Sequence, residues 1–253
     1  MRGMLPADVL SRGSGTDMND SYISVDLETT GLNPKIDKII EIGAVKVVNG
    51  QVEGHFHSLI SPRQKLTQRI TDLTGINDEM LKEAPGIEAC IGGFLDFSGE
   101  LLLLGHNIIF DYSFLKRAVV NQKLEFDREG VDTLKMCRRF MPENSKKSLD
   151  NACAYYDIKR TASHRALEDA ADTCRLYQVL WERYGSGHPE AFAQQQLIYK
   201  VKSEQPATKK QKEDLRYLSK YHRIELSFEI AYLTRNEVSR ITDKIISKYG
   251  RIK

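Results

Sequence analysis

The stretch SYISVDLETTGLNP, at residues 21–34, carries two acidic residues, Asp26 and Glu28, only two positions apart. Residues 21–25 have the pattern of a short strand, and side chains two positions apart on a strand point to the same side of a sheet. Two carboxylates held that close repel each other, and a divalent cation between them removes the repulsion. The stretch therefore predicts a metal site that uses Asp26 and Glu28 as ligands.

A second acidic element follows an apolar run further along the chain. The run LLLLG, at 101–105, is long enough for a strand, and GHNIIFDYSFL begins at its last residue. Asp111 is expected to open a helix over 111–122, where a negative charge is favourable. Considered alone, Asp111 is best explained as an N-cap, and His106 and Asn107 as polar anchors at the strand end.

A third element combines a histidine with acidic residues. In HRALEDAADTCRLYQVL, His164 precedes or begins a helix expected over 165–184, and Asp169 lies five residues later. That separation corresponds to about 1.4 helical turns, so both side chains can reach one cleft if His164 lies on the preceding loop. Asp172, one turn beyond Asp169, is a second candidate ligand.

The remaining pattern predicts an α/β fold. Strands are expected at 21–26, 39–48, 52–60 and 101–105, with a short segment at 131–134, and helices at 67–73, 77–82, 87–97, 111–122, 148–156 and 165–184. Asn49 and Gly50 are a strong signal for a two-residue hairpin turn. Three antiparallel strands followed by alternating helices and strands indicate a sandwich around a mixed sheet. Glu41, an acid within an apolar strand, is expected to support the site or the fold.

The composition fits one globular core with a small appendage. The chain has 253 residues, of which 41% are hydrophobic and 28% charged, and its longest apolar run is far too short to cross a bilayer. The four cysteines are widely spaced and form no CxxC pair, which favours reduced, buried thiols and a cytoplasmic protein.

Charge and composition divide the chain into four expected segments. They are a leader or disordered tail at 1–17, a globular domain at 18–185, a linker at 186–207 and a basic helical hairpin at 208–253. Residues 209–253 carry twelve Lys and Arg against six Asp and Glu. The side chains expected inside the hairpin are Leu215, Leu218, Tyr221, Val238, Ile241 and Ile245, with Thr234 as an N-cap. A basic tail suits work on a polyanion, although a solvated helical face explains it as well.

The motifs DLETTG, GHN…FD and H-x-x-x-x-D, in this order and at these spacings, resemble the DEDD superfamily of 3′→5′ exonucleases in its histidine-containing branch. The sister branch has Tyr four residues before its last Asp, whereas Arg165 stands there in this chain and His164 stands five before Asp169. The similarity is greatest to proofreading exonucleases of the DNA polymerase III epsilon type, including those within Gram-positive replicative polymerases. It covers about residues 21–184 and implies a ribonuclease H-like exonuclease domain over 18–185.

The resemblance also implies a role for each motif residue. Asp26, Glu28, Asp111 and Asp169 would bind two Mg²⁺ or Mn²⁺ ions, and His164 would be the general base. Substrate contacts would come from Leu27, Thr29, Thr30, Gly31, His106, Asn107 and Phe110. Among these, Leu27 can instead pack in the core, and Phe110 can pack rather than stack on a base.

The implied function is hydrolysis of phosphodiester bonds at the 3′ end of DNA, of proofreading or repair type, with release of nucleoside monophosphates from a preferably single-stranded end. Two alternatives remain open: an exoribonuclease or RNA-trimming enzyme, and an inactive nucleic-acid-binding module. The C-terminal hairpin could grip a nucleic-acid backbone through Lys209, Lys210, Lys212 and Arg216. It could equally dock a DNA polymerase or another replication partner.

Overall fold

The computed structural model describes residues 18–160 and 164–252, so the expected leader at 1–17 lies outside the described residues. Its centre is a six-stranded sheet in the order β3-β2-β1-β4-β5-β6. The strands are β1 (Tyr22–Thr29), β2 (Ile39–Val48), β3 (Gln51–Leu59), β4 (Leu102–Gly105), β5 (Glu129–Asp132) and β6 (Gln195–Gln196). Strand β1 pairs antiparallel with β2 and parallel with β4. The predicted sandwich around a mixed sheet is confirmed.

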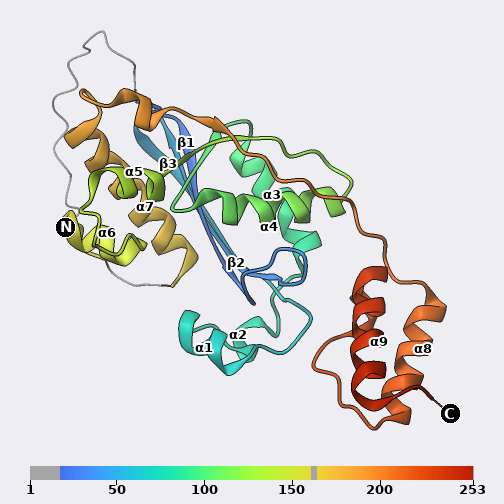
Figure 1. Cartoon of the computed structure of the whole chain (residues 1–253). Helices are drawn as coiled ribbons and strands as arrows, with labels where there is room; N and C mark the ends of the chain where they lie inside the picture. The colour runs from blue at the N-terminus through green and yellow to red at the C-terminus, as the bar shows by residue number, and fades with distance from the viewer. Residues whose placement is uncertain (1–17, 161–163, 253) are drawn as a thin grey trace.

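Helices cover both faces of this sheet (Figure 1). On one face lie α3 (Ile87–Ser98) and α4 (Ile108–Asn121), and on the other lie α5 (Thr133–Phe140), α6 (Leu149–Tyr155) and α7 (Ala166–Tyr184). The short helices α1 (Gln68–Thr74) and α2 (Asp78–Leu81) pack around Ile40 of β2. The C-terminal helices are α8 (Lys209–Tyr221) and α9 (Arg235–Tyr249), and two 3₁₀ turns occur at Pro189–Phe192 and Ile230–Tyr232.

The turn between β2 and β3 and the alternation along β1 follow from local chemistry. Asn49 has φ 50° and Gly50 has φ 74°, the pair of positive values that a tight two-residue hairpin requires. On β1, Ile23 and Val25 are buried toward α3 and α4, whereas the Ser24 hydroxyl donates to the carbonyl of Ala170 in α7 at 2.7 Å. Alternation continues along the strand, so Asp26 and Glu28 share the α7 side of the sheet.

Several elements differ from the expected ones. Strand β1 continues to Thr29, and α4 begins at Ile108 rather than Asp111, because Asn107 has φ 78° and starts the helix from a left-handed conformation. Helix α5 was not predicted. Part of the expected linker packs on the domain, since β6 pairs antiparallel with β5 and both Phe192 and Leu197 are buried in its core.

The two C-terminal helices form a hairpin with its own small core. Its buried members include Leu215, Leu218, Val238 and Ile245, with Ile241 packed against them. Tyr221 was expected inside, but its side chain is 47% exposed because it lies at the end of α8. Thr234 caps α9 as predicted, and its backbone N–H donates to the Glu237 carboxylate in a reciprocal capping box.

The hairpin contacts the larger domain through ion pairs and backbone hydrogen bonds. Lys38 pairs with Glu237 of α9, and Glu204, in the linker that leads into the hairpin, pairs with Arg117 of α4 at 2.8 Å. The connection between α8 and α9 runs beside residues 63–65, where the N–H of Lys65 donates to the carbonyl of Ser227 at 2.7 Å. Both ion pairs are largely shielded from water, so they help to hold the C-terminal segment against the larger domain.

The structure bears on two expectations for the whole chain, the state of its cysteines and the lack of a membrane-spanning segment. All four cysteines are free, and three of them are buried. Among the helices of the described residues, none combines the length and the apolar character that crossing a bilayer requires.

Candidate active site

Strand β1 carries two of the acidic residues into the interior of the protein. The side chain of Glu28 is buried, with 8% of the residue exposed, and Asp26 is half-buried. Both lie on the side of the sheet that α7 covers, where water that could separate their charges is scarce. Their closeness to each other and to α7 is therefore electrostatically costly in the absence of a cation.

Helix α7 starts unusually close to the sheet because β2 has a glycine beneath it. A Cβ built on Gly43 would lie 2.1 Å from the backbone carbon of Ala166, so any side chain at that position would collide with the start of α7. Beside it, the wholly buried Glu41 accepts hydrogen bonds from the Ala166 N–H at 3.0 Å and from the Arg165 guanidinium at 2.8 Å. These contacts fix the loop residue His164 and the first turn of α7 over β1.

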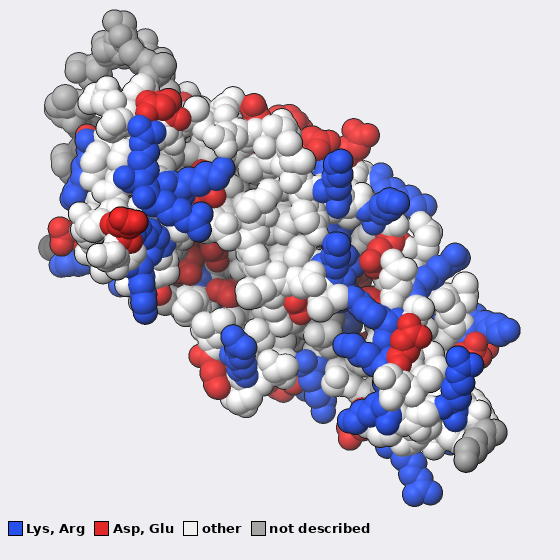
Figure 2. Space-filling view, in the orientation of Figure 1, with Lys and Arg blue, Asp and Glu red and all other residues white. Residues whose placement is uncertain are grey.

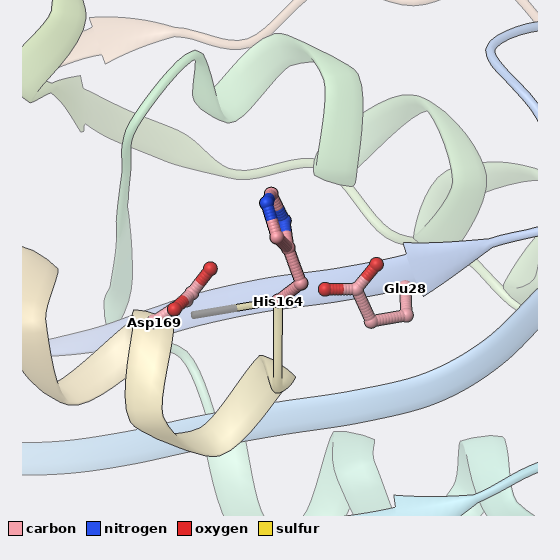
Figure 3. Close-up of side chains that lie close together, drawn as sticks. All are labelled: Glu28, His164 and Asp169. Atoms are coloured by element: carbon pink, nitrogen blue, oxygen red, sulfur yellow. The ribbon is translucent and has the colours of Figure 1, made fainter. Parts of the chain in front are cut away.

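Three candidate side chains converge at this place (Figure 3). A ring nitrogen of His164 and one carboxylate oxygen each of Glu28 and Asp169 lie within 4.8 Å of one another. In Figure 3 Glu28 projects from β1 and Asp169 from α7, on either side of the histidine. His164 has φ 59°, a strained conformation for a residue other than glycine, and such strain is common at functional sites.

Asp111 joins the same group from the opposite helical layer. It is 4% exposed, in the first turn of α4, and it accepts a hydrogen bond from the backbone N–H of Leu27 at 3.1 Å. Leu27 lies between Asp26 and Glu28, so this bond ties α4 directly to the strand that carries both acids. The side chain of Leu27 points the other way and is buried in the core, which favours packing over a contact with substrate.

The electrostatics show how tightly the carboxylates are grouped. Burial raises the pKa of Asp26 well above the usual range, and the charges of Asp111, Asp169 and Glu28 raise it further. Burial and then the charge of Asp169 raise the pKa of Glu28 to about 8. The pKa values of Asp111 and Asp169 are also raised, chiefly by burial. Four acids that oppose one another's ionisation in one place are suited to binding cations.

The donor set fits a hard divalent cation. It consists of carboxylate oxygens with one imidazole beside them, which matches the preference of Mg²⁺ and Mn²⁺ for oxygen ligands. Asp26, Glu28, Asp111 and Asp169 are the residues that would hold such ions. Bound cations would compensate the charges of these four carboxylates.

An arginine also reaches the site, and it was not among the residues expected there. Arg160 forms ion pairs with Asp169, with Asp172 at 2.6 Å and with Asp150. Asp172, the second candidate ligand, is fully buried and paired with Arg160 and Arg175, so it supports Asp169 rather than lining the site. Because Arg160 is a single basic residue on a loop, no periodic pattern indicates where its side chain lies. The excess of acidic residues near it in the sequence was the only signal that it would form ion pairs.

The loop after Glu28 is held mainly by its own hydrogen bonds. The Thr29 hydroxyl donates to the Gly31 carbonyl at 2.7 Å, and the Thr30 N–H donates to the Lys38 carbonyl at 2.9 Å. The backbone donor of Thr30 is thus used within the protein and is not free to hold a nucleotide. A Cβ on Gly31 would lie 2.5 Å from the Asp37 carboxylate, so a larger residue there would displace the Asp37 side chain.

The other expected substrate contacts lie around the start of α4. His106 bonds through its ring nitrogens to the Thr133 hydroxyl at 2.9 Å and the Lys147 carbonyl at 2.6 Å, so it is an anchor rather than a free contact. Burial lowers the pKa of His106, although the hydrogen bond to the Lys147 carbonyl acts in the opposite direction. Asn107 is exposed, and the half-buried Phe110 packs against Phe114 with 5.1 Å between ring centres. Asn107 and Phe110 therefore remain available to a ligand.

An apolar side chain that sequence reasoning did not single out lies on the same loop. Leu32 is 83% exposed, although it is only four residues beyond Glu28. A large exposed apolar residue next to a polar site offers a surface for the flat face of a base. The signal that could have identified it was an apolar residue within the turn sequence TTGLNP.

The sheet order, with helices on both faces, is the ribonuclease H-like fold that the motifs implied. The chain belongs to the Exonuclease family, whose sequence profile matches residues 23–177. This confirms the resemblance inferred from the three motifs.

Curated relatives are similar over the same region. The chain is 36% identical over 160 residues to the PolC-type DNA polymerase III of Thermotoga petrophila, covering 63% of this chain and 12% of that protein. It is 37% identical over 160 residues to the PolC-type DNA polymerase III of Bacillus subtilis, covering 62% and 11%. The chain thus spans about an eighth of the length of these relatives.

Solved structures share the fold. Exonuclease X, solved in complex with 5′ overhanging duplex DNA, superposes with a TM-score of 0.55 at 23% identity, covering 68% of this chain and 99% of that chain. The nuclease domain of 3′hExo, a DEDDh family member bound to rAMP, gives 0.59 at 18% identity, with 71% and 98% covered.

Proposed function

We propose that this exonuclease removes nucleoside 5′-monophosphates one at a time from the 3′ end of DNA, with two divalent cations in its site. The observation that carries the proposal is the convergence of Glu28, Asp169 and His164 within 4.8 Å, with Asp26 and Asp111 interacting with the same group. The similarity to PolC-type DNA polymerases supports DNA as the substrate and a proofreading or repair role.

The side chains divide the reaction between them. His164, held on the loop before α7, accepts a proton from the water that attacks the phosphorus. The bond from phosphorus to the 3′ oxygen of the preceding nucleotide breaks, so the phosphate leaves with the terminal nucleoside. Mg²⁺ or Mn²⁺ ions held by Asp26, Glu28, Asp111 and Asp169 would supply positive charge and would make the water easier to deprotonate. Asn107, Phe110 and Leu32 contact the terminal nucleotides.

RNA is the alternative substrate, and one observation favours it. The structures similar to this chain include 3′hExo bound to rAMP and a 3′-exonuclease that recognises the histone mRNA stem-loop. Discrimination between DNA and RNA rests on whether the active site accepts a 2′ hydroxyl. An inactive binding module is disfavoured, because the chain retains all four acids and the histidine together.

The test is digestion of matched DNA and RNA oligonucleotides labelled at the 5′ end, in Mg²⁺ or Mn²⁺. A 3′→5′ enzyme shortens the labelled strand step by step and releases monophosphates, with DNA digested faster than RNA. Asp26→Ala is the blank, and a Glu53→Ala variant, altered at an exposed residue of β3, is the matched control. Release of labelled mononucleotide at the outset would show the opposite polarity and refute the proposal.

We also propose that the protein acts in the cytoplasm, close to a DNA polymerase. Its cysteines are free thiols, and its curated relatives contain the same domain within polymerases. The C-terminal hairpin is the part of the chain available for such a partner. Co-purification of a polymerase that is lost when residues 208–253 are removed would support this arrangement.

A further inference from the structure

A pocket of about 380 Å³ lies between the exonuclease domain and the C-terminal hairpin. One wall is the loop that follows the acidic strand, from Pro34 to Lys38, and the floor includes Phe114 of α4. The opposite wall is α9, through Arg240, Ile241 and Lys244. The pocket therefore exists only because the hairpin is docked, and none of it belongs to the cluster of acids and His164.

The pocket and the candidate active site share one loop. The Thr30 N–H donates to the Lys38 carbonyl at 2.9 Å, and the Lys38 N–H donates to the Thr30 hydroxyl at 3.0 Å. The near end of this loop follows Glu28, and its far end, Asp37 and Lys38, forms the wall of the pocket. The loop therefore links the strand that carries Glu28 to the wall of the pocket.

Charge distinguishes α9 from the other basic residues around the pocket. Lys38, Arg63 and Arg117 are each paired with an acid. Within the part of the chain that the structure describes, Arg240 and Lys244 form no ion pair, so their charge is available to a ligand. Figure 2 shows Lys and Arg side chains gathered where the hairpin meets the larger domain.

The other lining groups suit a base. Phe114 and Ile241 give the pocket an apolar surface, and a volume of about 380 Å³ lies within the range of small-molecule sites. At its edge Tyr232 is 54% exposed, with the Arg63 guanidinium 4.1 Å from its ring centre. An apolar floor, one exposed aromatic ring and a cationic wall suit a single-stranded nucleic acid.

We propose that this pocket binds the single-stranded segment of substrate that precedes the 3′-terminal nucleotide, with Arg240 and Lys244 contacting its phosphates. The inference rests on the proposed exonuclease function and assigns α9 to substrate binding. It differs from the expectation drawn from sequence, which placed the contact on Lys209, Lys210, Lys212 and Arg216. Those residues lie on α8, which does not line the pocket, and Lys212 is bonded to the Ala231 carbonyl at 2.6 Å.

The test compares two charge reversals in the full-length chain. One variant carries Arg240→Glu and Lys244→Glu, and the matched control carries Lys210→Glu and Arg216→Glu on the exposed side of α8. For single-stranded DNA of about twelve nucleotides, the α9 variant should lower kcat/KM about tenfold and reduce the dependence of log kcat/KM on log salt by about 1.4, the value for two lost phosphate contacts. On a dinucleotide, the kcat/KM of the α9 variant should stay near the wild-type value. The kcat/KM of the control variant should stay near the wild-type value on both substrates.

Three outcomes would overturn the inference: unchanged digestion of the long substrate, an equal loss on the dinucleotide, or an equal loss in the α8 control. Thermal unfolding of each variant verifies that the hairpin is folded. If the wild-type protein releases no nucleotide at all, the proposed function fails instead. Fluorescence anisotropy of the labelled oligonucleotide in EDTA then still tests the pocket, since loss of binding only in the α9 variant would uphold it.

Discussion

Glu41 shows how a buried acid can act on the site without facing it. It is fully buried and accepts hydrogen bonds from Arg165, from the Ala166 N–H and from His57 at 2.7 Å. Burial raises its pKa, but these bonds more than offset that effect and leave the pKa below its ordinary value. Glu41 therefore stays ionised and holds the two residues that follow His164.

Glu41→Gln should lower kcat while leaving KM nearly unchanged. Loss of the charge weakens the hydrogen bonds to Arg165, so His164 is less well oriented. Removing a supporting contact of this kind lowers activity by about tenfold or more. His57→Gln, which removes only the outermost partner, is the control and should have a smaller effect. Steady-state kinetics on a labelled oligonucleotide measure both; an unchanged kcat in Glu41→Gln would show that the contact is merely structural.

His164→Ala should reduce turnover by about 10²–10⁴-fold, the usual range for a general base. Metal affinity should be largely retained, because four carboxylates remain. Isothermal titration with Mn²⁺ alongside single-turnover kinetics separates the two effects. Equal loss of Mn²⁺ affinity would make His164 a ligand rather than a base.

The raised pKa of Glu28 predicts how stability depends on pH when metal is removed. A carboxyl group with a higher pKa in the folded chain binds more protons when folded, so stability falls as pH rises from its ordinary value of 4.5 toward about 8. In EDTA, Tm should therefore decrease across this window, and Mg²⁺ should raise Tm most at its upper end. Glu28→Gln should flatten the decrease in EDTA; an unaltered slope would refute this origin.

At the scale of elements, periodicity and turn chemistry predicted most of the sheet. The bounds of β2 agree with the expected 39–48, and the Asn49-Gly50 turn is where it was placed. Helix α5 was missed because it is a short segment between two polar stretches, and β6 because two residues carry no periodic signal. The start of α4 was misplaced because the left-handed Asn107 replaces the acidic cap that the pattern favoured.

Gly43→Ala should displace α7 and weaken the enzyme in two ways. The added Cβ would lie 2.1 Å from the backbone of Ala166, and overpacking of this kind costs about 1–3 kcal/mol. Because α7 carries Asp169 and follows His164, kcat should fall as well. Gly92→Ala on α3, where nothing lies within 4 Å of the new Cβ, is the matched control. Urea unfolding measures the difference, and equal stability of the two variants would contradict the argument.

At the scale of the whole molecule, the order of the motifs indicated that they would meet, but not how the hairpin would dock. The backbone N–H of Leu27, which lies between Asp26 and Glu28, donates to Asp111 across 84 positions of sequence and so brings two of the motifs together. Docking of the hairpin depends on single contacts such as Lys38 with Glu237, and no local pattern marks such pairs. Arg160 was missed for the same reason, since its three acidic partners come together only in the folded chain.

Lys38→Glu should loosen the hairpin. The buried Glu237 would face a second acid in place of its partner, and breaking one side of a buried ion pair is strongly destabilising locally. Limited proteolysis between residues 198 and 206 should then proceed faster than in wild type. Lys35→Glu, at an exposed position of the same loop, is the control; equal cleavage rates in the two variants would show that the pair does not secure the hairpin.

The two-residue strand β6 has a consequence for how molecules of this protein meet one another. An open sheet has two rims at which a foreign strand can add, and such addition leads to aggregation. At one rim, β6 offers only Gln195 and Gln196, too short a template for a neighbour to extend. At the other, β3 presents the exposed polar residues Glu53, His55 and His57. The short β6 and the polar side chains of β3 both make the addition of a foreign strand at these rims less favourable.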